Sequence, residues 1–218
     1  MISPRNLLPL SSMNKAIIIL GRYPEVGHGK SRLAKEIGED RAIEEYRKLV
    51  ERLFIEVAKL EPQITPYFLF AEEVDTGKAH GWLGNRIKIL QPKSPEIEKN
   101  LLTAFERVLM GKTDKVISIA SDTPAVNKGV IEKAMEVLNL SDVLVGKDQS
   151  KGIYIFGVHR RIRNRKLLQK FFSRPEEFTP YDWVLKIVKK YGLNLYELPP
   201  QIDIDTAEDL KKWKNTSK

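Results

Sequence analysis

Ala16-Ile-Ile-Ile-Leu20 is followed directly by Gly21-Arg-Tyr-Pro-Glu-Val-Gly-His-Gly-Lys-Ser-Arg-Leu33. The first segment is a short apolar run rich in β-branched residues, which predicts a buried strand. The second segment carries three glycines and a proline, so it predicts a loop, with a helix that begins near Lys30. A strand that leads through such a loop into a helix is typical of an α/β sheet.

The rest of the chain repeats this alternation of strands and helices. Apolar residues recur at three- and four-residue steps over residues 41–60, which predicts an amphipathic helix. Further helices are expected over residues 97–110, 128–138, 163–172, 181–190 and 206–213, and further strands over residues 64–71, 87–90, 115–120, 142–145, 153–158 and 193–198. The pattern predicts a three-layer α/β/α fold with a mostly parallel mixed sheet. Ligands of such sheets bind beyond the carboxyl ends of the strands, which draws attention to the exits after Leu20 and Ala120.

The 218 residues contain no repeat, no low-complexity block and no linker long enough to divide the chain. Residues 1–12 lack periodicity and hold two prolines, so we expect a disordered N-terminal extension before a single domain over residues 13–218. No apolar run approaches the roughly 20 residues that span a bilayer. We therefore expect a soluble, cytoplasmic protein without a transmembrane segment.

The composition limits the kinds of site that the chain can form. It has no cysteine, which excludes a disulfide framework, an iron–sulfur cluster and a thiolate zinc site, whereas oxygen-ligated cations such as Mg²⁺ or Mn²⁺ stay open. The 37 basic and 29 acidic residues give a net charge of +8, which favours anionic partners, although the abundant charge is also typical of a thermophile surface. The densest basic cluster lacks interleaved aromatic residues and indicates a solvated helix start rather than a specific nucleic-acid site. Its members are Arg160, Arg161, Arg163, Arg165 and Lys166.

The first loop has the features of a phosphate-binding site. Its glycines allow a close approach of the backbone, and a helix N-terminus carries partial positive charge. Two cations within one helical turn, a lysine and an arginine, suit a diphosphate. The candidate phosphate-binding residues are Gly27, Gly29, Lys30, Ser31 and Arg32. A P-loop kinase or NTPase is an alternative, but its strict motif requires glycine where the chain has Pro24.

Two acidic residues follow predicted strands. Asp122 lies in Ser121-Asp-Thr-Pro124, directly after the strand at residues 115–120, where a carboxylate can hold Mg²⁺ or Mn²⁺ against substrate phosphates. The same residues also suit a turn or a helix N-cap. Asp205 is a candidate second carboxylate for the metal or acceptor site. Asp205 with Glu208, or Thr206 with Asp209, alternatively has the spacing of a helix capping box.

Several motifs, taken in order, resemble the GT-A-type glycosyltransferase-like family, some members of which are labelled radical-SAM/selenodomain-associated transferases. These motifs are Gly27-His-Gly-Lys-Ser-Arg-Leu33, Ser121-Asp-Thr-Pro124, Gly152-Ile-Tyr-Ile-Phe-Gly157, Trp183 and Asp203-Ile-Asp-Thr206. The resemblance covers about residues 13–210 and implies a nucleotide-diphospho-sugar transferase fold. The Lys-Ser-Arg-Leu segment is also similar to that of the phospholactate and molybdenum-cofactor guanylyltransferases.

The chain departs from this family at one place. Where the family has Asp-Gly-Gly before its tyrosine-containing strand, this chain has Ser150, Lys151 and Gly152. The acidic residue of that motif is missing unless Asp148 replaces it. In the resembled family this motif belongs to the part of the site that contacts the sugar or the acceptor, so the departure affects that part.

The resemblance implies a metal-dependent transferase that uses a nucleotide-linked donor, with a nucleotide-sugar as the expected ligand and an acceptor that stays open. Lys30 and Arg32 would hold the donor phosphates and Asp122 would coordinate Mg²⁺ or Mn²⁺. Asp148 and Asp205 are the candidate general bases. Two alternatives stay open: a guanylyltransferase-like nucleotidyltransferase that takes an NTP and releases pyrophosphate, and a degenerate member that binds a nucleotide without turnover.

Overall fold

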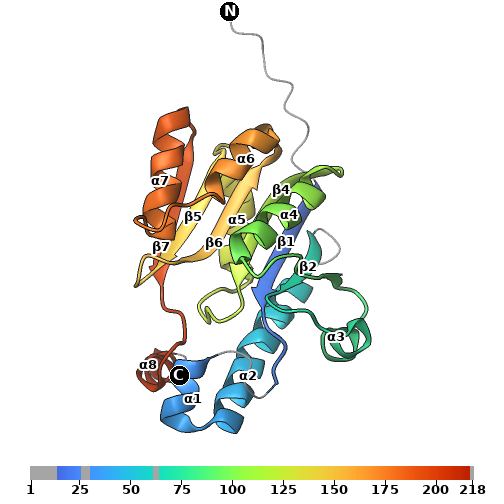
Figure 1. The fold of residues 1–218 in the computed structure, drawn as a ribbon, viewed down its shortest axis with the longest axis vertical. Coiled ribbons are helices and arrows are strands. Elements are labelled where there is room, and N and C mark those ends of the chain that lie inside the picture. The colour runs from blue at the N-terminus through green and yellow to red at the C-terminus, as the bar shows by residue number, and fades with distance from the viewer. Residues whose placement is uncertain (1–13, 26–29, 61–63, 217–218) are drawn as a thin grey trace, which may run out of the picture.

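The computed structural model describes residues 14–25, 30–60 and 64–216, arranged around one seven-stranded sheet (Figure 1). The strands are β1 (Asn14–Gly21), β2 (Ile64–Phe70), β3 (Lys88–Leu90), β4 (Thr113–Ala120), β5 (Val143–Asp148), β6 (Ile153–His159) and β7 (Leu195–Gln201). The helices are α1 (Ser31–Ile37), α2 (Glu39–Ala58), α3 (Thr76–Leu83), α4 (Ile97–Leu109), α5 (Lys128–Val137), α6 (Arg165–Phe171), α7 (Pro180–Tyr191) and α8 (Ala207–Thr216), with a short 3₁₀ helix η2 (Arg160–Ile162).

The strand order is β3-β2-β1-β4-β6-β5-β7, and every pairing is parallel except the two that involve β6. This confirms the predicted mostly parallel mixed sheet. Leu20 of β1 pairs with Ala120 of β4, so the two strand exits singled out in the sequence lie side by side at the carboxyl edge. Because β6 runs the other way, its last residue, His159, lies opposite Lys115 near the start of β4. The basic cluster that follows β6 is therefore at the opposite edge of the sheet.

The sheet is covered on both faces. Ile17, Ile18 and Ile19 of β1 have no exposed surface, which explains why this strand is uniformly apolar rather than alternating. One face packs against α2, α3 and α5, and the other packs against α4, α6 and α7, which Figure 1 shows in front of the strands. The predicted three-layer α/β/α architecture is confirmed.

A separate small cluster of buried apolar residues brings the last helix against the first two. It consists of Leu33, Ala42, Leu49, Ile204 and Leu210. Polar contacts reinforce it, since the amide of Ala207 donates to Glu36 at 3.0 Å and Lys214 pairs with Glu45 at 2.9 Å. Figure 1 shows α8 beside α1 at the end of the molecule below the sheet. We call this group of α1, α8 and the start of α2 the small subassembly.

All the strands and helices predicted from the sequence are present, with boundaries shifted by a few residues. The sequence did not reveal α3, because Thr76–Leu83 contains two glycines and lacks apolar periodicity. Its N-terminus is defined by the side chain of Asp75, which accepts from the amide of Lys78 at 2.8 Å. The predicted extension over residues 1–12 lies outside the described residues. Within the described part of the chain, no helix is both long and apolar enough to span a membrane.

Candidate functional site

The Lys30 side chain lies between two carboxylates at the carboxyl edge of the sheet. Its Nζ is 2.6 Å from Asp122 Oδ2 and 2.9 Å from Asp205 Oδ1, and only 7% of the side chain is exposed. Arg32 extends the network, with a guanidinium nitrogen 2.9 Å from Asp205 Oδ2, while most of its side chain faces solvent. The structure therefore brings together four of the residues that the sequence singles out, two cationic and two anionic.

The backbone at Lys30 places this side chain at the start of α1. Lys30 has φ 53° and ψ 38°, a left-handed conformation that is uncommon for a residue with a side chain. Its carbonyl accepts the amide of Ala34 at 2.8 Å, which begins the helix. Ser31 is the first residue of α1 and is exposed. The predicted phosphate-binding glycines, Gly27 and Gly29, lie outside the described residues.

Asp122 lies in the turn that follows β4. The turn is joined to β1 by a hydrogen bond from Ser121 N to Leu20 O of 3.0 Å. The carbonyl of Asp122 accepts the amide of Ile204 at 3.1 Å, which holds the segment between β7 and α8 against the exit of β4. The N-cap of α5 is Asn127, so the alternative N-cap role for Asp122 is wrong.

The start of α8 leaves the Asp205 carboxylate directed at Lys30. Thr206 N and Oγ1 donate to Asp209 at 2.9 and 2.6 Å, and Asp209 N donates back to Thr206 Oγ1 at 3.2 Å. This reciprocal pair is the predicted capping box. The alternative pair of Asp205 with Glu208 is wrong, because Glu208 pairs with Lys212.

Charge pairing decides the protonation of the central groups. Burial lowers the pKa of Lys30, but the facing carboxylates of Asp122 and Asp205 outweigh burial and raise it above its ordinary value. Burial likewise raises the pKa of Asp205, but Lys30 and Arg32 hold it below its ordinary value. At neutral pH Lys30 is therefore cationic and Asp205 is anionic.

Asp203, which the sequence motif also contains, lies near enough to the acidic residues of the site to feel their charge. Burial raises the pKa of Asp203, and the negative charges of Asp205, Asp148 and Asp122 add to the effect. These four carboxylates therefore share one region of the molecule.

Asp148 is held locally. Its carboxylate accepts the amides of Ser150 at 2.7 Å and Gly152 at 2.8 Å, within the tight turn between β5 and β6. With the Asp148 carboxylate in this position, a Cβ at Gly152 would collide with Asp148 Oδ2. The structure thus places Asp148 and Gly152 together, on a turn separate from the ion pairs of Lys30.

The donor atoms suit a divalent cation that binds together with substrate phosphates. Across the described ranges, no three Asp, Glu or His side chains are grouped closely enough to hold a metal by themselves. Mg²⁺ usually takes only one or two protein carboxylates and completes its shell with phosphates and water. The carboxylates of Asp122 and Asp205, which both point at the Lys30 ammonium, supply these two protein ligands.

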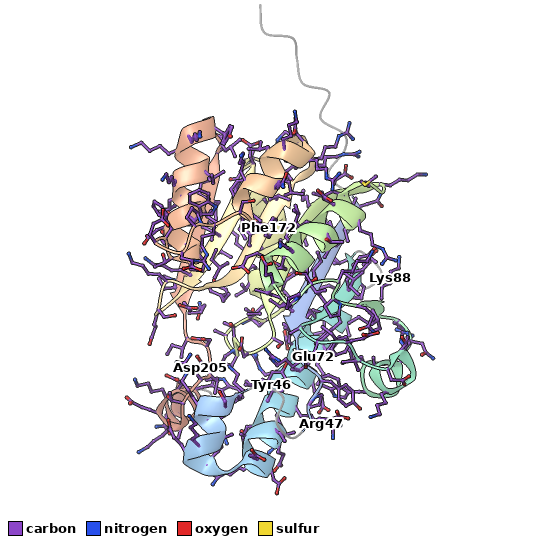
Figure 2. All side chains as sticks on the ribbon, in the orientation of Figure 1. Tyr46, Arg47, Glu72, Lys88, Phe172 and Asp205 are labelled. Carbon is purple, nitrogen blue, oxygen red and sulfur yellow. The ribbon has the colours of Figure 1, made fainter. Side chains whose placement is uncertain are left out.

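A cavity of about 370 Å³ lies at this site, and we call it the charged cavity. Its lining residues are Leu20, Gly21, Arg22, Lys30, Tyr46, Ala71, Pro95, Ile97, Ala120, Ser121, Asp122 and Asp205. Figure 2 shows Tyr46 and Asp205 on this side of the molecule, below the ends of the strands.

Tyr46 supports the wall of the charged cavity, a role that the sequence did not reveal because Tyr46 falls on the apolar face of the predicted helix. Its hydroxyl accepts the amide of Arg22 at 2.7 Å and lies 3.1 Å from Ser121 Oγ. A Cβ at Gly21 would lie 2.7 Å from Ser121 Oγ and 2.8 Å from the Tyr46 hydroxyl, so this packing requires glycine.

The fold has known counterparts. A nucleotide-diphospho-sugar transferase, provisionally so named, from Desulfovibrio desulfuricans G20 superposes with a TM-score of 0.85 at 22% identity, over 94% of this chain and 88% of the other. The 4-diphosphocytidyl-2C-methyl-D-erythritol synthase of Anaerococcus prevotii gives a TM-score of 0.63 at 11% identity, over 94% and 96%. Rv0371c of Mycobacterium tuberculosis, in a complex with manganese, gives 0.51 at 13% identity, over 92% and 97%. These similarities confirm the predicted nucleotide-diphospho-sugar transferase fold.

Sequence comparison adds the family. No curated protein matches the chain significantly. Residues 54–174 match the family described as "uncharacterized protein conserved in bacteria (DUF2064)". That match runs from the last turn of α2 to the residues just after α6 and includes Asp122, Asp148 and Gly152. The chain therefore belongs to the DUF2064 family and has the fold of the nucleotide-diphospho-sugar transferases.

Proposed function

We propose that this chain is a metal-dependent transferase that uses a nucleotide-diphospho-sugar as its donor. The observation that carries the proposal is the ion-pair network of Lys30, Arg32, Asp122 and Asp205 at the carboxyl edge of the sheet, three members of which (Lys30, Asp122 and Asp205) line the charged cavity. Ligands of open α/β sheets bind at this edge. The name of the structurally similar Desulfovibrio protein supports the choice of donor class.

In this proposal the two cations hold the donor phosphates. Lys30 supplies a compact charge at the base of the cavity, and Arg32, largely exposed, supplies a planar fork for two phosphate oxygens. Both would favour the departing nucleoside diphosphate as its negative charge develops.

Asp122 and Asp205 would hold Mg²⁺ or Mn²⁺ next to those phosphates, once the Lys30 ammonium that lies between the two carboxylates has turned to a phosphate. When bound, the cation supplies further positive charge for the leaving diphosphate. The manganese complex of the similar mycobacterial protein supports this assignment. The proposal assigns no general base, because Asp205 is paired with Lys30 and Arg32 and Asp148 accepts hydrogen bonds within its own turn.

Nucleotidyl transfer is the second candidate function. The observation that favours it is the similarity in fold to the diphosphocytidyl synthase over nearly the whole of both chains. The same two cations would then hold a nucleoside triphosphate, and pyrophosphate would leave. A non-catalytic nucleotide-binding protein is the third candidate, favoured by Ser150 and Lys151 at positions where the resembled family has Asp and Gly.

Calorimetric titration of the full chain with UDP-, GDP- and ADP-sugars and with nucleoside triphosphates, each with and without Mn²⁺, tests the proposal. We expect Mn²⁺-dependent binding of a nucleotide-sugar, followed by its turnover. Preference for a triphosphate, with pyrophosphate release, would support nucleotidyl transfer instead. Binding without turnover of any donor would support the non-catalytic alternative, and absence of all binding would refute the nucleotide site.

Two variants assign the binding to this ion-pair network. Arg32→Ala removes a charge-assisted contact of about 1.5–3 kcal/mol, so we expect nucleotide affinity to fall about tenfold or more. Asp122→Asn keeps the size of the side chain, and we expect it to abolish the Mn²⁺-dependent part of the binding. Arg47→Ala is the matched control, because Arg47 is an exposed arginine on α2 that pairs with Glu51 (Figure 2).

A further inference from the structure

A second cavity adjoins the charged cavity and has a different chemical character. Its volume is about 220 Å³. We call it the apolar pocket, and its lining residues are Leu20, Ile97, Glu98, Leu101, Ser118, Ile119, Ala120, Ile153, Tyr154, Phe156, Phe171, Phe172, Arg174, Pro180 and Val184. Three of them, Leu20, Ile97 and Ala120, also line the charged cavity, so the two spaces meet at the exits of β1 and β4.

The apolar pocket exists because β4 carries small side chains where neighbouring strands carry large ones. Ser118 and Ala120 point to the face covered by α4, α6 and α7, on which Val116 is buried nearer the start of the strand. These small residues leave a space above β4. Helix α4 forms one wall of that space, and the segment from α6 to α7 forms the opposite wall. The space therefore follows from the sequence of β4.

The far wall is aromatic. The ring of Phe156 lies 5.4 Å from that of Phe171 and 5.8 Å from that of Phe172, measured between centroids. Figure 2 shows Phe172 in front of the sheet, in the region between α6 and α4. Phe172, Leu101 and Ile153 pack against the core but stay partly exposed, which is the exposure expected of side chains that line an open pocket.

One ion pair joins two walls of the pocket. Arg174, after α6, lies 3.2 Å from Glu98 on α4, and it also donates to the carbonyl of Phe178 at 2.8 Å. Two hydroxyl-bearing residues also line the pocket: Ser118, whose hydroxyl makes only a long contact of 3.4 Å with the carbonyl of Phe156, and Tyr154, whose hydroxyl donates to the carbonyl of Pro199 at 3.0 Å. The rest of the lining offers few partners for water.

We propose that the apolar pocket binds an apolar group of the acceptor, a ring or a short hydrocarbon chain. That this group belongs to an acceptor depends on the function proposed above, whereas the binding of an apolar group depends on the pocket alone. Apolar cavities of about 150 Å³ stay dry and bind molecules such as benzene, so the larger space here accommodates a ring of that size. A ligand seated there would place its polar end past Leu20 and Ala120, in the charged cavity.

Binding of benzyl alcohol, with glycerol as the polar comparison, tests this inference by NMR of the methyl-labelled full chain. We expect saturable shifts with benzyl alcohol at the methyl groups of Leu20, Ala120 and Val184, and none with glycerol. Leu101→Trp should fill the half-open side of the pocket and weaken the binding at least tenfold. Leu102→Trp is the matched control, since Leu102 is also half-buried on α4 but does not line the pocket.

The outcomes separate the two proposals. No saturable shift at the pocket methyls, or shifts unchanged in Leu101→Trp, would overturn the inference. Ser118→Leu fills the pocket from the sheet and is the second variant if Leu101→Trp does not fold. If benzyl alcohol binds as expected while no nucleotide binds, the pocket stands and the proposed transferase function fails.

Discussion

Lys30→Met isolates the role of the ammonium group, because methionine nearly preserves the length of the side chain. The substitution removes two charge-assisted contacts, of 2.6 and 2.9 Å, and leaves Asp122 and Asp205 without their shared cation. Removing one partner of a fully buried pair costs about 3–5 kcal/mol. Here the carboxylates are 27% and 29% exposed, so water compensates in part and we expect a loss of ~2–3 kcal/mol in the free energy of unfolding. For a chain of this size that corresponds to ~4–12 °C in melting temperature.

The stability lost in Lys30→Met should depend on pH, because Asp205 changes its protonation. Lys30 lowers the pKa of Asp205 in the wild type, so its contribution to stability is present above pH 3.8, the ordinary pKa, and is lost as the pH falls through the lower folded pKa. Without Lys30, only Arg32 opposes the effect of burial, so the pKa of Asp205 in the variant should lie above its wild-type value and Asp205 should take up its proton at a higher pH than in the wild type. The difference in stability between the two proteins should therefore narrow as the pH falls from 7 through 3.8.

Thermal and urea unfolding at several pH values measure this difference, with Lys35→Met, an exposed lysine of the same helix, as control. Millimolar Mn²⁺ should restore part of the lost stability of Lys30→Met, because a cation can again bind between the two carboxylates. A melting temperature equal to that of the wild type, or a deficit that stays the same at pH 4 and pH 7, would refute the reasoning.

Three further predictions concern residues around the site and at the opposite edge of the sheet. Tyr46→Phe removes the acceptor of the Arg22 amide inside a buried contact, so urea unfolding should show a loss of about 1–3 kcal/mol; a change below 0.5 kcal/mol would contradict it. Thr206→Ala breaks the capping box of α8 and should cost about 1 kcal/mol in the same assay, with Thr103→Ala, on the exposed face of α4, as control. The pKa of His159 is lowered by burial and by Arg161 to about 4, so its NMR titration should have a midpoint near that value. Since the unfolded state then binds the extra proton, stability should rise with pH between about 4 and 6.5, and a His159 midpoint near 6.5 would contradict the assignment.

Most of the fold could be predicted from the sequence, because the strands are buried on both faces and the helices are strongly amphipathic. An uninterrupted apolar run such as β1 has few alternatives in a chain without a membrane-length segment, and α2 shows a clear helical period. The antiparallel direction of β6 could not be read from periodicity, because a strand buried in either direction has the same apolar pattern. The glycine-rich α3 gave no signal because its start depends on one side-chain contact, that of Asp75.

The candidate site was predictable where a residue lies in the loop or turn after a strand. Asp122 lies in the turn after β4 and Lys30 at the end of the loop after β1, and the structure brings the two side chains within 2.6 Å because β1 and β4 are neighbours in the sheet. Asp205 was harder to assign, because its neighbours also satisfy the spacing of a capping box, and only the geometry shows that Thr206 and Asp209 form the cap. The support from Tyr46 could not be predicted, because its position on α2 is indistinguishable from that of a core residue until the hydroxyl has a partner.

The small subassembly determines when the site can form during synthesis. Lys30 directly precedes α1, near the front of the chain, whereas Asp205 and the apolar residues Ile204 and Leu210 come from its last fifth. A ribosome-bound chain that already contains the strands β1 to β6 lacks both the second carboxylate and the apolar contacts that seat α1 and α8 together. Its Lys30 would have only Asp122 to face. The site can therefore form only late in synthesis, when the C-terminal residues have been made and α8 packs against α1.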